Sequence, residues 1–234
     1  NGESGWHVRH VHTLTELLLE HLIEKTDRYG VSQADISTIS MASALHDIGK
    51  IAIDEKILNK PGRFTDEEFE IMKPHSAIGG DLLRDLPLYQ DEPLVKCAFE
   101  ICRWHHERYD GRGYPDGLKG DEIPISAQIV ALADVYDALT SERCYKKAFS
   151  HEVAVQMILD GKCGSFNPLL MECLTDIADQ LPLELSQEEI LDENNRRSLH
   201  NVAQEMLHHA ELTASERTLQ LLEKEREKYS FFAM

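Results

Sequence analysis

The hydrophobic residues of this 234-residue chain recur mostly at three- and four-residue steps, which is the repeat of an α-helix. The first such face consists of Val8, Val11, Leu14, Leu18 and Leu22. No run of alternating apolar and polar residues is followed by hairpin chemistry, as a pair of strands would be. The pattern therefore predicts an all-α protein.

Capping residues predict where the later helices begin and end. Ser32 with Asp35, and Thr65 with Glu68, have the spacing of a capping box. Gly49 is placed to end the helix that Ser32 opens. The glycines and prolines between residues 110 and 124 predict a loop. Further helices are expected over 65–74, 78–84, 93–105, 125–140 and 150–159, and from Asn167-Pro168 onward.

The character of the chain changes at about residue 181. A third capping box, Ser186 to Glu189, is followed by a stretch over 198–228 without glycine or proline. We therefore expect a domain over 1–180 and a helical extension over 181–234. Because its apolar stripe falls short of regular heptads, the extension fits either a helix packed on its own domain or a homodimer contact. The stripe consists of Val202, Met206, Leu212, Leu219 and Leu222.

Composition narrows the choice of partners and compartment. The 24 Lys and Arg against 42 Asp and Glu give a net charge of −18, which argues against duplex nucleic acid. A locally positive site can still bind a small anion. We find no membrane span and no signal peptide, and because the chain starts at Asn1 we expect a further domain upstream. The cysteines are odd in number and form no CxxC pair, which indicates reduced thiols in a cytoplasmic protein; they are Cys97, Cys102, Cys144, Cys163 and Cys173.

The segment His46-Asp47-Ile-Gly-Lys50 is the first candidate for chemistry. Imidazole and carboxylate groups are ligands for hard or borderline metals. Adjacent residues on a helix point about 100° apart, so both reach one site only near a helix end or by facing two metals. A carboxylate can bridge two cations through its two oxygens. Taken alone, such a dipeptide is more often a solvated helix end.

Other ligand types stand at similar places along the chain. His75 and His105-His106 lie at expected helix ends, and Asp134 is a lone carboxylate in an apolar helix, where burial is costly unless a partner or metal compensates. Glu3 and His7 are four residues apart and share a helix face. These residues together are hard to explain as core packing and predict a metal centre.

Four segments between roughly residues 3 and 175 appear in a specific combination. They are His46-Asp47-Ile-Gly-Lys50, His75, His105-His106-Glu-Arg-Tyr-Asp110-Gly111-Arg-Gly113-Tyr114-Pro115, and Asp134-Val-Tyr-Asp137-Ala-Leu-Thr-Ser-Glu-Arg143. Together they resemble the HD-GYP domain, a branch of the HD phosphohydrolase superfamily. The resemblance implies a helical bundle and a phosphodiesterase that opens cyclic di-GMP to linear pGpG and further to GMP. The alternatives are a preference for 3′,3′-cyclic GMP-AMP, and a non-catalytic domain that senses the dinucleotide or docks a partner.

The resemblance also implies a centre of two or three divalent metal ions. Its ligands would be Glu3, His7, His46, Asp47, His75, His105, His106 and Asp134. Asp47 would bridge two metals, and Glu3 would accompany a third. A set of nitrogen and oxygen donors favours iron or manganese, with nickel, zinc and magnesium as further candidates. Substrate contacts are implied for Lys50, Tyr114, Asp137, Arg143 and Lys146.

The expected reaction follows from this ligand set. Two metals would lower the pKa of a bridging water, and the hydroxide would attack phosphorus, with Asp47 and Lys50 as catalytic residues. Asp110 is a candidate proton donor to the leaving oxygen. The Gly111–Pro115 loop is expected to be a tight turn at the rim of the site and to offer a surface for protein partners. Asn167 replaces the family's usual Asp with little expected consequence. The other histidines are expected to be exposed or packed; they are His10, His12, His21, His151, His200, His208 and His209.

Overall fold

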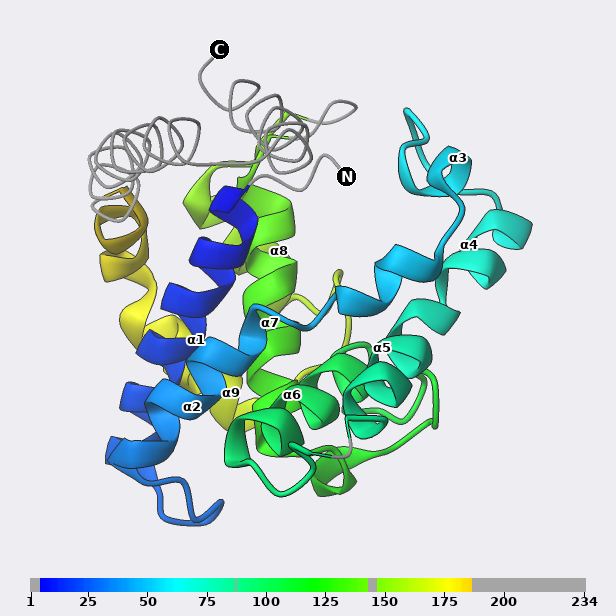
Figure 1. The fold of residues 1–234 in the computed structure, drawn as a ribbon. Coiled ribbons are helices and arrows are strands. Elements are labelled where there is room, and N and C mark those ends of the chain that lie inside the picture. Colours follow the sequence, from blue (N-terminus) through cyan, green and yellow to red (C-terminus); the bar gives the residue numbers. More distant parts are fainter. Residues whose placement is uncertain (1–4, 87, 143–146, 187–234) are drawn as a thin grey trace, which may run out of the picture. The chain divides into compact units, whose positions relative to one another are not determined.

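Helices form nearly all of the regular structure in this computed structural model, which describes residues 5–86, 88–142 and 147–186. No strand occurs within those ranges, so the all-α prediction is confirmed there. In chain order (Figure 1) the elements are α1 (Gly5–Lys25), α2 (Gln33–Ser43), the 3-10 turn η1 (Ile48–Ala52), α3 (Glu55–Leu58), α4 (Asp66–Met72), α5 (Pro74–Arg84), α6 (Pro93–Trp104), η2 (Gly120–Glu122), α7 (Ile125–Thr140), α8 (His151–Leu159), α9 (Pro168–Ile177) and η3 (Ala178–Gln180).

The capping residues act at most of the expected helix starts. The Thr65 amide donates to the Glu68 carboxylate at 2.7 Å, and the Glu68 amide donates to Thr65 Oγ1 at 3.3 Å. The Ser150 hydroxyl accepts the Val153 amide at the start of α8. Asn167 caps α9 and also donates through Nδ2 to the Tyr29 hydroxyl at 2.7 Å. An Asp carboxylate would have no hydrogen to donate there.

Several boundaries differ from the sequence-based expectation. Helix α2 ends at Ser43 rather than near Gly49, and Gly49 lies inside η1. Helix α5 begins at Pro74 rather than at residue 78, because proline fits the first turn of a helix. The short elements η1, α3, η2 and η3 were not expected. The third capping box begins at the last described residue, Ser186, and continues beyond it. The apolar stripe over 198–228 and Cys144 lie outside the described residues.

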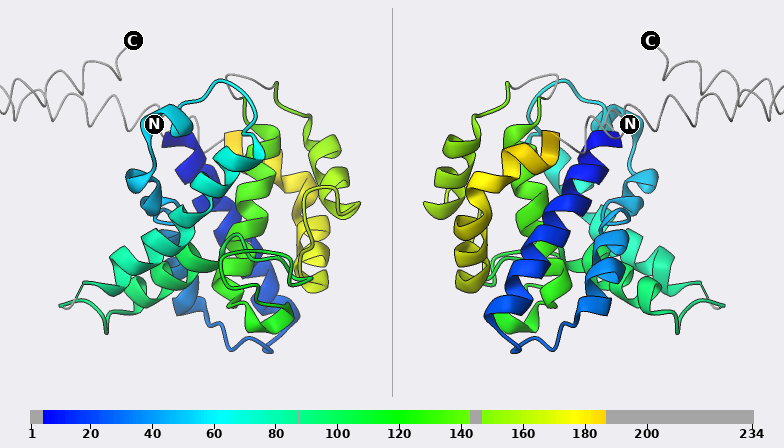
Figure 2. Two further views of the ribbon diagram at one scale, coloured as in Figure 1. Left: turned by 90° about the vertical axis from the view of Figure 1, so that its right-hand side faces the viewer. Right: turned by 90° about the vertical axis from the view of Figure 1, so that its left-hand side faces the viewer.

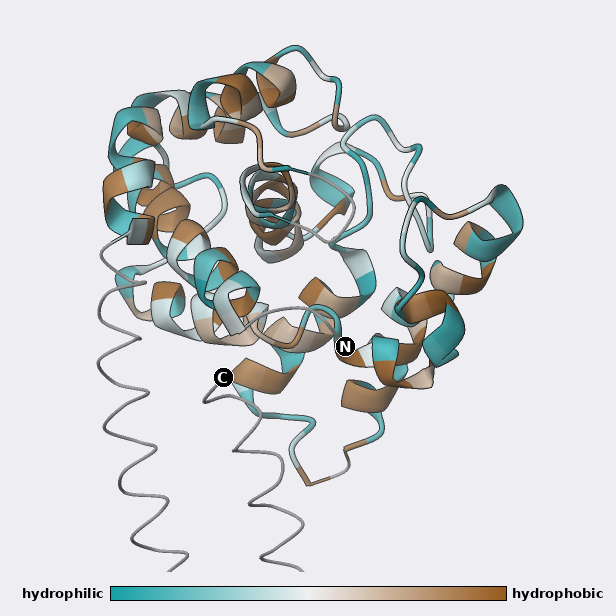
Figure 3. Ribbon diagram, turned by 90° about the horizontal axis from the view of Figure 1, so that it is seen from above, coloured by the Kyte–Doolittle hydropathy of each residue, from teal (hydrophilic) through white to brown (hydrophobic). Residues whose placement is uncertain are grey.

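Helix α7 is the central element of the unit formed by residues 1–185. It packs against α1, α6 and α8, while α2 and α9 pack against α1 (Figures 1 and 2). Apolar and polar residues alternate around most helices, as one-sided burial requires (Figure 3). The fully buried side chains of α7 include Ile129 and Leu132, and the same core reaches Leu181 and Leu185. Because α7 is buried in this core, a polar side chain that projects from it is held in a fixed position.

Two general features of the described residues bear on the earlier expectations. None of their helices is both long enough and apolar enough to cross a lipid bilayer. The cysteines among them form no disulfide; these are Cys97, Cys102, Cys163 and Cys173.

The turn η1 lies directly against α5, and this contact depends on two glycines. A Cβ atom added to Gly49 would lie 1.9 Å from the His75 carbonyl oxygen and 2.6 Å from the Gly79 nitrogen. A Cβ on Gly79 would lie 2.9 Å from the Gly49 nitrogen. Only backbone without side chains fits this crossing. It brings the residues just before η1 next to the first turn of α5.

The crossing provides a stability test. We expect Gly49→Ala to lower the free energy of unfolding by about 3 kcal/mol, because the backbone of α5 would have to move. In a chain of this size that corresponds to a fall in Tm of roughly 6–12 °C. Gly80→Ala is the matched control, since its nearest contact would be the Arg103 Cβ at 3.1 Å. Thermal unfolding with equal losses for both variants would contradict the assigned role of Gly49.

Candidate metal centre

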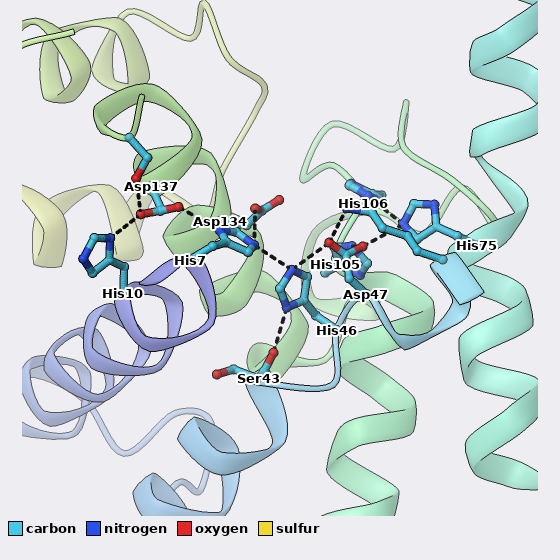
Figure 4. Close-up of polar contacts among 12 residues, drawn as sticks. His7, His10, Ser43, His46, Asp47, His75, His105, His106, Asp134 and Asp137 are labelled. Carbon is cyan, nitrogen blue, oxygen red and sulfur yellow. Dashed lines mark hydrogen bonds and ion pairs between the residues drawn. The ribbon is translucent and has the colours of Figure 1, made fainter. Parts of the chain in front are cut away.

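Polar residues from the ends of separate helices meet beside α7 (Figure 4). His7 belongs to the first turn of α1, and the His46-Asp47 pair lies in the turn between α2 and η1. His75 is the second residue of α5, and His105-His106 follow the last residue of α6. Asp134 projects from α7. Seven of the eight ligands predicted from the sequence are therefore close together, while Glu3 is outside the described residues.

The Asp47 carboxylate lies between two groups of imidazoles. Its Oδ2 is 3.1 Å from His46 Nε2, and its Oδ1 is 3.2 Å from His75 Nε2 and 3.9 Å from His105 Nε2. Ligand atoms of Asp47, His75, His105 and His106 all lie within 4.8 Å of one another, and so do those of His7, His46 and Asp47. Asp47 is the member that both groups share, as a bridging carboxylate would be.

Backbone carbonyl groups fix the orientation of three of these rings. His46 Nδ1 is 2.8 Å from the Ser43 carbonyl oxygen, and His75 Nδ1 is 2.7 Å from that of Met72. His105 Nδ1 lies 3.0 Å from the carbonyl oxygens of Ile101 and Cys102. A carbonyl can only accept, so each Nδ1 carries the hydrogen and donates. In the neutral ring, Nε2 then has a lone pair that faces the centre, as metal-ligating histidines require.

Asp137 performs the same function for His7. His7 Nδ1 donates to Asp137 Oδ2 at 2.7 Å, and His10 Nδ1 donates to Oδ1 at 2.6 Å. The Ser141 hydroxyl also donates to Oδ1. Asp137 is 1% exposed, so it lies behind His7 and not at a surface that substrate reaches. This corrects the predicted substrate contact, and it shows His10 to be part of the site, which the sequence interpretation missed.

The contacts across the centre bring acceptor atoms together. His7 Nε2 lies 3.3 Å from His46 Nε2, and His106 Nε2 lies 3.2 Å from His75 Nε2. Asp134 Oδ1 is 3.6 Å from His7 Nε2. His105 Nε2 and Asp47 Oδ1 are buried without a hydrogen-bond partner. Lone pairs that face one another in a buried site repel unless a proton or a cation lies between them.

The pKa values of the site reflect this crowding. Burial lowers the pKa of His46, but the hydrogen bond and charge of Asp47 outweigh it and raise the value to about 9. Burial lowers the pKa of His105 to about 4. Burial opposes ionisation of Asp47, yet the adjacent imidazoles of His46 and His75 and the charge of Lys50 hold its pKa well below the ordinary value. A proton on His46 therefore partly compensates the Asp47 charge.

The donor set fits divalent metal ions. It offers imidazole nitrogens already oriented by carbonyl or carboxylate acceptors, a carboxylate shared by two groups, and buried ligand atoms without a hydrogen-bond partner among the described residues. Cations placed among these atoms would relieve the repulsion between them.

The predicted substrate contacts fall into two groups. Lys50 Nζ lies 2.6 Å from Asp47 Oδ2, and the Tyr114 ring stacks on His106 with a centroid distance of 4.8 Å. Both side chains therefore border the centre. Arg143 and Lys146 lie outside the described residues.

The loop that carries Tyr114 is held by a residue the sequence interpretation did not single out. The buried Glu107 accepts hydrogen bonds from the amides of Asp116 and Gly117 at 2.7 and 2.9 Å. A Cβ on Gly113 would lie 2.4 Å from the Arg108 nitrogen, so the loop packs tightly on the segment after His106. The position of Glu107 directly after His105-His106 was the available sequence signal.

Asp110 does not suit the role of proton donor. Its Oδ2 accepts from Arg108 at 2.9 Å and from Arg112 at 3.1 Å. Although desolvation acts in the opposite direction, these guanidinium groups lower the pKa of Asp110 to about 2. The carboxyl group is therefore ionised near neutral pH, which corrects the earlier expectation.

Comparison with known families matches residues 7–167 to the model of the HD domain. The chain belongs to the HD domain family. The matched segment includes every ligand described above, from His7 to Asp134. The histidines and aspartates among the motif residues that gave the resemblance thus lie within the matched segment, and several of them meet in space.

Curated proteins similar to this chain include several phosphodiesterases. The chain is 40% identical over 189 residues to a probable cyclic di-GMP phosphodiesterase of Vibrio cholerae, covering 79% of this chain and 42% of that one. It is 39% identical over 178 residues to the 3′3′-cGAMP-specific phosphodiesterase 2 of the same organism, covering 76% and 32%. The chain thus spans less than half the length of these relatives.

A solved structure is also similar. The crystal structure of a V. cholerae cyclic GMP-AMP-specific phosphodiesterase matches with a TM-score of 0.47 and 19% identity, covering 75% of this chain and 45% of that one.

The carboxylate behind His7 provides the first test of the HD domain centre. We expect Asp137→Asn to lower metal affinity roughly 10- to 100-fold, because the amide can accept from only one of the two imidazoles. Ser141→Ala is the control, since it removes one hydrogen bond and leaves both oxygens of Asp137. Elemental analysis after dialysis against a weak chelator measures the effect. Equal metal content in wild type and Asp137→Asn would contradict this role.

The proton on His46 provides a second test. Its raised pKa of about 9 means that a metal ion must displace a proton at neutral pH. Apparent affinity should therefore rise about tenfold per pH unit below that pKa. His105 adds no slope near neutrality because its pKa is already about 4. Titrations with Mn²⁺ between pH 6 and pH 8 measure the dependence, and a flat profile would refute proton displacement.

Proposed function

We propose that this HD domain is of the HD-GYP type and is a metal-dependent phosphodiesterase that hydrolyses cyclic dinucleotides. Cyclic di-GMP is the substrate that we put first, with linear pGpG as the first product and GMP as the product of a second cleavage. The observation that carries the proposal is the Asp47 carboxylate shared by two imidazole groups, whose buried atoms Asp47 Oδ1 and His105 Nε2 have no hydrogen-bond partner among the described residues.

We further propose that the centre holds two divalent ions, with a third where Glu3 contributes. The nitrogen and oxygen donors favour iron or manganese, and nickel, zinc and magnesium suit parts of the same set. Bound ions would supply a nucleophile from water at neutral pH and would neutralise charge on the phosphodiester.

The protein's own residues would orient the reactants. Asp47 places one oxygen toward each imidazole group, which sets where the cations lie. The Lys50 ammonium adds a positive charge beside Asp47, where it favours a non-bridging phosphate oxygen. Arg143 and Lys146, implied by the resemblance, are assigned to holding the dinucleotide. The carbonyl groups behind His46, His75 and His105 keep the rings from turning as charge develops.

A preference for 3′,3′-cyclic GMP-AMP is the second candidate. The relatives named for cyclic di-GMP and for cGAMP are almost equally similar, at 40% and 39% identity. Both substrates offer the same phosphodiester and differ in one base. A purely sensory or docking domain is the third candidate, but it has no need of a complete ligand set.

Cellular context completes the proposal. We place the chain in the cytoplasm, where the thiols described above would remain reduced. We retain the division into a catalytic domain over 1–180 and an extension over 181–234, for which packing on its own domain and a homodimer contact remain the two alternatives. A protein partner would meet the Gly111–Pro115 loop.

Substrate assays test the proposed function. Chain loaded with Mn²⁺ or Fe²⁺ is incubated with cyclic di-GMP or 3′,3′-cyclic GMP-AMP, and linear products are separated by chromatography. We expect turnover of at least one of them and none after metal removal. No turnover of either by protein shown to contain two metals would leave only the sensory or docking function.

The bridging role of Asp47 has its own test. We expect Asp47→Ala to lose metal and activity together, by at least about a hundredfold, because a shared ligand should cost more than an outer contact. Asp91→Ala is the matched control, since that carboxylate is fully exposed. Retained activity in Asp47→Ala would refute the bridging assignment.

A further inference from the structure

A row of aromatic rings leads away from the metal centre. The His106 ring stacks on Tyr114 with an interplanar angle of 30°. Tyr114 in turn meets Phe69 of α4 at 6.0 Å and 88°, which is an edge-to-face contact. The Lys73 ammonium lies over the Phe69 ring, 5.4 Å from its centroid. Phe69 is thus one ring removed from a ligand of the centre.

Phe69 is too exposed to be explained as a residue of the hydrophobic core. Helix α4 buries Met72, whereas Phe69 remains 42% exposed and Ile71 49% exposed. The place of Phe69 is nevertheless well defined, because the Thr65–Glu68 capping box fixes the start of its helix at Asp66, three residues earlier. The structure therefore holds an exposed aromatic ring at a fixed position beside the centre.

We propose that Phe69 stacks against a nucleobase of the substrate while the phosphodiester lies at the metal centre. This proposal rests on the proposed function and adds the residue that recognises the base. In a dinucleotide each base is one ribose away from phosphorus, so a bound base must lie close to the ligands. Aromatic side chains stack on bases of any kind, since every base has a π face. Phe69 then strengthens binding of guanine and adenine alike.

Substitutions at Phe69 separate a flat ring from simple apolar bulk. Phe69→Leu keeps apolar volume without a π face, and Phe69→Trp keeps the π face. Ile71→Ala is the matched control, because it removes an equally exposed apolar side chain two residues along the same helix. For the Mn²⁺-loaded chain, we expect Phe69→Leu to raise KM for cyclic di-GMP roughly 5- to 100-fold with kcat nearly unchanged. Phe69→Trp and Ile71→Ala should keep the wild-type KM.

A fluorescent substrate analogue gives a readout that does not depend on turnover. Cyclic dinucleotide with 2-aminopurine in place of one guanine loses fluorescence when that base stacks. We expect quenching on binding to wild type and Phe69→Trp, and little quenching with Phe69→Leu at saturating protein. Tm and metal content of each variant report whether the fold and the centre are intact.

The outcomes separate this proposal from the proposed function. Wild-type KM and full quenching in Phe69→Leu would overturn base stacking while leaving the phosphodiesterase in place. Quenching that depends on Phe69, without turnover by metal-loaded wild type, would overturn the enzyme and retain the base contact. If Phe69→Leu loses metal, a Phe69→Trp variant with intact metal but no quenching overturns the stacking proposal.

Discussion

The partial burial of one carboxylate, Asp47, is the constraint on which the site depends. A charge removed from water must be compensated, and here the imidazoles of His46 and His75 and the ammonium of Lys50 surround it. His46 precedes Asp47 in the turn after α2, Lys50 lies in η1, and His75 lies in α5. Because His75 belongs to α5 and His105, 3.9 Å from Asp47 Oδ1, follows α6, the chain must bring the end of α2, the start of α5 and the end of α6 to one point. The Gly49–Gly79 crossing makes this possible, because a single Cβ there would keep η1 and α5 apart.

Hydrogen bonds on the far side of each ring fix the orientation of these ligands. Each of His7, His46, His75 and His105 uses Nδ1 on an acceptor behind it, so each Nε2 points inward. Three of these rings donate to backbone carbonyls near helix ends. The fourth, His7, donates to Asp137 on the buried helix α7. The geometry is thus set by rigid elements and costs little reorganisation when charge accumulates at the centre.

Local signals predicted much of the fold and the ligands. The bounds of α7 over 125–140 were anticipated because proline, apolar spacing and a polar end agree there. Most predicted ligands do meet: the histidines and Asp47 stand at or beside helix ends, and Asp134 projects from the interior of α7. The contacts between helices could not be predicted from these local signals. His10 and Asp137 act only because α1 lies against α7, and Gly49 passes beside α5 rather than ending α2. Local patterns do not specify which faces will touch.

Two metal ions bridged by Asp47 are the central claim, and their magnetic interaction tests it most directly. Bridged ions in two-metal hydrolases lie about 3.5–4 Å apart, close enough for their electron spins to couple. Electron paramagnetic resonance of the fully Mn²⁺-loaded chain should therefore show an exchange-coupled pair. A hyperfine pattern of isolated Mn²⁺ ions at full loading would contradict the account.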